Sequence, residues 1–88
     1  MTNPEQIPVP LSKPIMRGDQ KITEITLRKP ASGELRGLKL MDVLNMDVVS
    51  LTVLVPRIST PTLTRADVEA MPLPDLLEVG VAITNFFA

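Results

Sequence analysis

The sequence predicts an α+β fold in which a β-hairpin is followed by three or four short α-helices. Apolar and polar residues alternate within residues 9–29, which is the spacing of half-buried strands. Further along, apolar residues recur every three or four positions, as in amphipathic helices. Between the two parts, Pro30 cannot donate to a strand ladder, and a turn-forming Ala-Ser-Gly follows it. We therefore expect a flexible tail (1–8) and one small domain (9–88), whose helical part covers residues 38–87.

The composition favours a thin aliphatic core. A chain of 88 residues buries only about 60–65% of the surface that its unfolded form exposes. Hydrophobic residues make up 44% of the chain, but only Phe86 and Phe87 are aromatic, and there is no Cys for a disulfide. No apolar run approaches the roughly 18–20 residues of a membrane span, and the first residues lack a signal-peptide pattern. We expect an intracellular protein without a membrane segment.

The first strand of the hairpin is predicted at the edge of a sheet. Val9, Leu11 and Ile15 form its apolar face, whereas Pro10 and Pro14 recur on the opposite phase. Proline has no N–H to donate, so it is tolerated where that side of the strand faces solvent. Such an edge argues against open-ended pairing between copies. It leaves dimers and closed rings open.

A turn containing Arg-Gly-Asp (17–19) joins this strand to a second strand over residues 21–29. Ile25 and Leu27 point to one face of that strand and their polar neighbours to the other. Arg-Gly-Asp is also an integrin-type tripeptide, but the backbone needs of a hairpin turn explain the glycine. An isolated hairpin is marginal in water, so this one must pack on another element or gain strands from another copy.

The helical part opens with a short helix over residues 40–46, followed by a segment whose structure the pattern leaves open. Asp47 is a suitable N-cap for a helix over residues 48–58, and Pro56 should kink or end it. Four apolar residues have helical spacing: Leu51, Leu54, Val55 and Ile58. The segment is also rich in β-branched residues, so a buried strand is the alternative.

Two further helices are predicted. Thr64 is the expected N-cap of a helix over residues 65–71. The last helix begins at Asp75, or a residue or two earlier, and ends near Phe87. Its apolar residues are Leu76, Val79, Ile83 and Phe86, widened by Leu77, Val81 and Phe87. Its opposite, polar face carries Asp75, Glu78 and Asn85.

This wide apolar face has two interpretations. A thin core needs it, and surplus apolar surface is also typical of a site for a protein partner. As the partner interface we predict Leu76, Val79, Ile83, Phe86 and Phe87.

The residue inventory argues against catalysis. The chain has no His and no Cys, its acids are scattered, and no phosphate-binding glycine motif is present. We expect no enzyme activity, no metal and no cofactor. Residues 1–39 carry a net charge of +3 (seven basic and four acidic residues) and residues 40–88 carry −4 (two basic and six acidic). The basic hairpin suggests an alternative function, a small regulatory protein that binds nucleic acid. No aromatic residue lies among its basic residues to stack on bases, so we expect no nucleic-acid partner.

Several stretches resemble the tail assembly chaperones of contractile-tailed bacteriophages related to P2 and Mu, the family of P2 tail protein E. They are residues 14–19, 22–30, 32–37, 42–44, 55–59 and 63–72. The most specific is Leu-Arg-Lys-Pro-Ala-Ser-Gly-Glu-Leu-Arg-Gly, at residues 27–37. The resemblance covers roughly residues 9–87.

The resemblance implies a non-enzymatic chaperone that binds the tape measure protein during tail assembly. It implies action in the cytoplasm of the host bacterium and absence from the mature virion. Further expected partners are a longer form made by translational frameshift and the tail tube protein, and a homo-oligomer is left open. Asn85-Phe86-Phe87 is compatible with frameshifting, because two Phe codons can supply a run of T.

Overall fold

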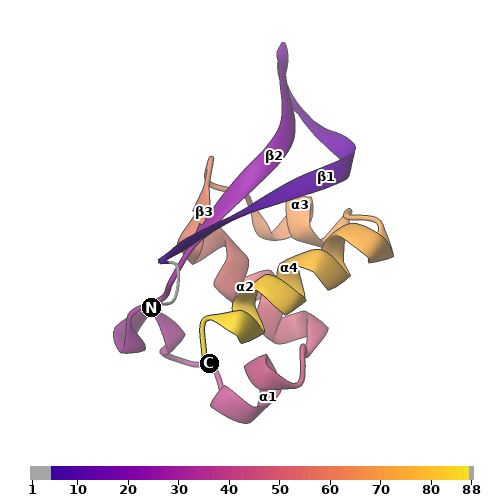
Figure 1. Cartoon of the computed structure of the whole chain (residues 1–88). Helices are drawn as coiled ribbons and strands as arrows, with labels where there is room; N and C mark the ends of the chain where they lie inside the picture. The colour runs from indigo at the N-terminus through magenta and orange to yellow at the C-terminus, as the bar shows by residue number, and fades with distance from the viewer. Residues whose placement is uncertain (1–4, 88) are drawn as a thin grey trace.

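The computed structural model describes residues 5–87 and confirms the α+β fold class (Figure 1). Three antiparallel strands form one sheet in the order β1-β2-β3. The helices gather on one side of the hairpin, whose turn extends beyond them (Figure 1). The elements are β1 (Gln6–Arg17), β2 (Gln20–Arg28), a 3-10 helix (Ser32–Leu35), α1 (Leu40–Leu44), α2 (Val48–Ile58), β3 (Ser59–Thr60), α3 (Arg65–Glu69) and α4 (Leu73–Asn85).

The sheet begins earlier than the sequence predicted. Residues 6–8 belong to β1, although we expected them in the flexible tail. The amide of Lys29 donates to the carbonyl oxygen of Glu5 at 2.6 Å, which extends the pairing to the first described residue. Ile7 packs against the core from this part of β1 and gives the strand a reason to continue. Residues 1–4 of the predicted tail lie outside the described residues.

β1 departs from regular pairing in its middle. Its register against β2 shifts between Pro10 and Ile15, so that residues 11–14 lie opposite the single residue Thr23. The strand bends there (Figure 1). The prolines of β1 lie on an edge strand, as predicted, where a missing N–H costs no ladder hydrogen bond.

Residues 48–58 form a helix, which decides between the two alternatives that the sequence left open. Asp47 is the N-cap, since its carboxylate accepts a hydrogen bond from the amide of Ser50 at 3.0 Å. The predicted apolar residues of this helix are at most 2% exposed. Their burial against the sheet and α3 outweighs the weak helix propensity of the β-branched residues. Pro56 lies in the last turn, and the helix ends at Ile58.

The first two residues after α2 form a short third strand, which no pattern in the sequence indicated. In β3, Ser59 lies opposite Leu27 of β2, and Thr60 lies opposite Thr26. β2 therefore has a neighbour on both sides and becomes the central strand. Ile25 and Leu27 are almost fully buried, as predicted. The core lies between the inner face of the sheet and helices α2 and α4.

Asp75 is the main difference on α4. We expected its side chain on the polar outer face, but the residue is only 3% exposed. Its carboxylate accepts hydrogen bonds from the backbone amides of Ser12 and Lys13 in the irregular part of β1. The bend of β1 leaves these amides without a partner in β2, and α4 supplies one.

Candidate partner-binding surface

The structure places most of the predicted partner interface inside the protein. Val79, Ile83 and Phe86 are 4% exposed or less, and Leu76 and Phe87 are partly buried against the same core. With two aromatic residues in the whole chain, the core needs this face of α4 for its volume. These five residues therefore offer little surface to a partner.

The apolar residues that α4 leaves exposed lie on the neighbouring face. Leu73, Leu77 and Val81 are 79%, 56% and 43% exposed, and their spacing of four aligns them along the helix. Leu77 and Val81 were expected from the sequence only to widen the apolar face of this helix. The signal for this second surface was the width of that face, which exceeds what one side of a helix can bury.

A groove runs beside this row of residues. It has a volume of about 490 Å³, and its lining is almost entirely apolar. We call it the apolar groove, and its lining residues are Met46, Leu51, Leu73, Pro74, Leu76 and Leu77. Met46 and Leu51 come from the α1–α2 corner and from α2, and the other four come from the first half of α4.

The α1–α2 corner brings Met46 against α4. Met46 has a φ of 59°, a left-handed conformation that side chains other than glycine rarely adopt. Its side chain lies over Gly80, and a Cβ at residue 80 would lie 2.7 Å from the Met46 sulfur. Glycine at this position therefore permits the close approach that forms one wall of the apolar groove.

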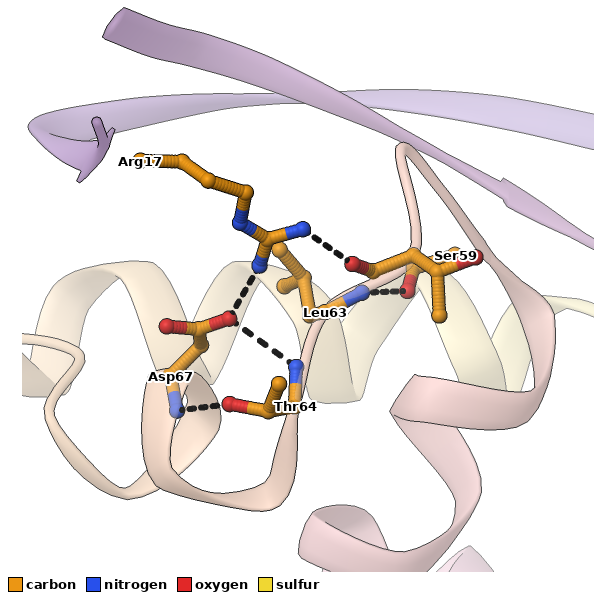
Figure 2. A network of polar contacts seen from close by, with 6 residues as sticks. Arg17, Ser59, Leu63, Thr64 and Asp67 are labelled. Atoms are coloured by element: carbon orange, nitrogen blue, oxygen red, sulfur yellow. Dashed lines mark hydrogen bonds and ion pairs between the residues drawn. The ribbon is translucent and has the colours of Figure 1, made fainter. Parts of the chain in front are cut away.

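The hairpin is fastened to the helical part by a polar network around α3 (Figure 2). The Arg17 guanidinium donates to the carbonyl oxygen of Thr62 and to the carboxylate of Asp67. Thr64 and Asp67 form the capping box of α3. The hydrogen bond from the Thr64 amide, together with Arg17, holds the pKa of Asp67 below its ordinary value despite partial burial. The arginine of Arg-Gly-Asp is therefore engaged in intramolecular contacts at the surface, which favours the turn interpretation.

A second network uses part of the basic surface that suggested nucleic-acid binding. Arg28 forms a bidentate ion pair with Glu34 and also donates to the carbonyl oxygen of Arg57. Arg57 in turn donates to the carbonyl oxygens of Glu34 and Arg36. The hydrogen bonds from Arg28 and from the Ala31 amide lower the pKa of Glu34 to about 2. The guanidiniums of Arg28 and Arg57 therefore bind groups in and near the 3-10 helix. Fewer basic side chains of this surface remain available to contact the phosphates of a nucleic acid.

Residues 5–87 contain neither a metal-binding cluster nor a membrane-spanning helix. No group of three or more His, Cys, Asp or Glu side chains there is placed to hold a metal ion. Within the same residues, no helix has the length and apolar character that crossing a membrane requires.

Comparison with known proteins identifies close relatives. A family model described as phage tail assembly chaperone proteins, E, or 41 or 14, matches residues 9–88. Tail assembly protein E of Escherichia phage P2 is 39% identical over 80 residues, which cover 91% of this chain and 88% of protein E. Tail assembly protein E′ of the same phage is 40% identical over 78 residues, covering 89% of this chain and 55% of E′. No solved structure matches the chain.

Proposed function

We propose that this chain, which belongs to the family of phage tail assembly chaperones, binds the tape measure protein of its phage during tail assembly. Family membership supports a role in tail assembly. The apolar groove and the exposed residues Leu73, Leu77 and Val81 of α4 support binding of a protein. Exposed apolar surface of this kind is what a chaperone offers to an aggregation-prone client. In this proposal the chain works without catalysis, metal or cofactor.

A longer form of the chain is the second part of the proposal. The matched stretch covers 88% of P2 protein E but only 55% of E′, so the two relatives share this region and E′ continues further. Frameshifting within the codons for Asn85-Phe86-Phe87 is one way to make such a pair. In this proposal the longer form recruits the tail tube protein. We expect an unbroken run of T in these codons of the gene and a longer product in mass spectra of infected cells. A broken run would show that the frameshift does not occur at these codons.

The proposed place of action is the cytoplasm of the host bacterium, before the tail is complete. A chaperone that holds its client only during assembly leaves the particle afterwards. The chain should therefore be found in lysates of infected cells and be absent from purified virions. Its presence in virions at the level of a structural protein would contradict this part of the proposal.

The direct test is co-expression of the chain with the tape measure protein of the same phage. The measured quantity is the soluble fraction of the tape measure protein with and without the chain, followed by pull-down. Higher solubility and co-purification are expected. If neither occurs, the experiment is repeated with the downstream reading frame fused to the chain. Failure of both forms would overturn the proposal.

A further inference from the structure

The shape of the apolar groove suits one kind of ligand. Its lining combines the row Leu73 and Leu77 on α4 with Met46 and Leu51 from the α1–α2 corner and α2. The row continues to Val81, so that apolar surface extends for about 12 Å along the helix axis. An elongated apolar surface parallel to a helix is typical of helix-in-groove recognition, in which the ligand contributes apolar residues on one face.

The charges around the groove indicate the charge that a ligand should carry. Both segments that line it, residues 40–56 and 70–87, contain acidic residues and neither lysine nor arginine. Their acids are Asp42, Asp47, Asp75 and Glu78. Asp75 is used by β1, but Glu78 is exposed on α4, one turn after Pro74 of the groove. Asp47, next to Met46, is also exposed and keeps its negative charge while its carboxylate caps α2 by accepting from Ser50. Each of the two segments that line the groove therefore carries an exposed acidic residue next in sequence to a lining residue, Asp47 beside Met46 and Glu78 beside Leu77.

The same charges argue against a second copy of the chain as the ligand. A twofold symmetric contact through this face would bring each acidic rim toward the rim of the other copy. No basic residue of the lining segments is available to compensate them. Like charges across an interface disfavour association, whereas opposite charges steer and stabilise it.

We propose that the apolar groove binds an amphipathic α-helix whose apolar face is flanked by lysine or arginine. The identification of that helix as a segment of the tape measure protein rests on the function proposed above. The chemistry of the ligand does not rest on it, because it follows from the lining and the charges of the groove alone.

The first test uses two stapled helical peptides of about 14 residues, roughly 21 Å long. They share one leucine face and differ only in the flanking residues, which are lysine in one and glutamate in the other. Binding of each to the full chain is measured by fluorescence anisotropy at low and high salt. The lysine peptide should bind at least about tenfold more tightly at low salt, and high salt should reduce the difference. Equal binding of both peptides, or no binding of either, would overturn the proposal.

Matched variants localise the binding. Leu77→Asp should weaken binding of the lysine peptide about tenfold or more, because it places a charge in the groove wall. Leu40→Asp is the control, since Leu40 is 54% exposed, similar to Leu77 at 56%, but lies near Phe87 at the other end of α4. Glu78→Lys should weaken binding roughly threefold to tenfold at low salt, and Glu24→Lys on β2 should not. Circular dichroism of all four variants is the check that each one folds. If Leu77→Asp binds as well as Leu40→Asp, the groove is not the site.

The oligomeric state and the tape measure protein give the remaining outcomes. A dimer that Leu77→Asp converts to a monomer, together with no peptide binding, would assign the groove to a second copy and overturn the proposal. If wild type and Leu77→Asp solubilise the tape measure protein equally well in co-expression, that outcome would support the chaperone function but would overturn the groove as the site of binding. If wild type binds the lysine peptide, but neither it nor the form fused to the downstream reading frame retains the tape measure protein, the proposed function is refuted and the groove is supported.

Discussion

The carboxylate of Asp75 in α4 accepts a hydrogen bond from the backbone amide of Ser12 in β1, with 2.9 Å between Ser12 N and Asp75 Oδ1. The other carboxylate oxygen accepts from the amide of Lys13 at 3.3 Å. Burial alone would raise the pKa of Asp75, but the hydrogen bonds from Ser12 and Lys13 outweigh it, so the pKa lies below its ordinary value. One buried side chain thus joins the edge of the sheet to the first turn of the last helix.

Asp75→Asn should lower the free energy of unfolding by about 1–3 kcal/mol. The amide keeps the shape of the carboxylate but removes its charge and turns an NH₂ group toward one of the two backbone donors. Urea denaturation followed by circular dichroism measures the change. The control is Glu78→Gln, an exposed acid on the same helix, which should stay within about 0.5 kcal/mol of wild type. An equal effect of both substitutions would show that charge on α4, and not the link to β1, determines the loss.

The ion pair between Arg28 and Glu34 should make stability depend on pH in the acid range. The pKa of Glu34 falls from an ordinary 4.5 to about 2 in the folded protein, chiefly through its hydrogen bond from Arg28. The folded state therefore binds fewer protons than the unfolded state between these values, so the stabilisation is lost as the pH falls through them. Thermal melts of wild type and Glu34→Gln should differ at neutral pH and converge near the lower value. Curves that remain parallel throughout would contradict this account.

Gly80 should tolerate alanine but not a larger residue. Alanine gains about 1 kcal/mol of helix propensity over glycine, and its Cβ displaces only the flexible end of Met46. We expect Gly80→Ala to lie within about 1 kcal/mol of wild type, and Gly80→Val to lose about 1–3 kcal/mol through overpacking. Thermal or urea unfolding measures both. A large loss in the alanine variant would mean that Met46 cannot move.

Arg17→Ala should loosen the hairpin with little effect on global stability. The side chains of Arg17 and Asp67 are 40% and 23% exposed, and ion pairs this exposed contribute at most about 1 kcal/mol. Amide hydrogen exchange should become faster in the outer parts of β1 and β2, whereas exchange in α2 should stay unchanged. Uniformly faster exchange across the whole chain would indicate that Arg17 supports the core instead.

The sequence alone determined most of the secondary structure. Local signals decide helix starts, and Asp47 and Thr64 cap α2 and α3 as predicted. The alternation in β2 and the spacing in α2 identified their buried faces, because periodicity depends only on neighbours along the chain. The resemblance to tail assembly chaperones, which rests on short motifs such as residues 27–37, is confirmed by the family match.

The tertiary structure decided what depends on distant partners. β3 exists because β2 lies beside Ser59 and Thr60, and Asp75 is buried because the bend of β1 presents two free amides. Likewise, apolar residues occupy more than half of the circumference of α4. The sequence of α4 therefore does not determine which of its sides packs against the core. α4 packs mainly against β1 and α1, and in this arrangement Val79 and Ile83 are buried whereas Leu73 and Leu77 are exposed. Periodicity identifies an apolar face, but only packing against other elements decides whether it faces the core or a partner.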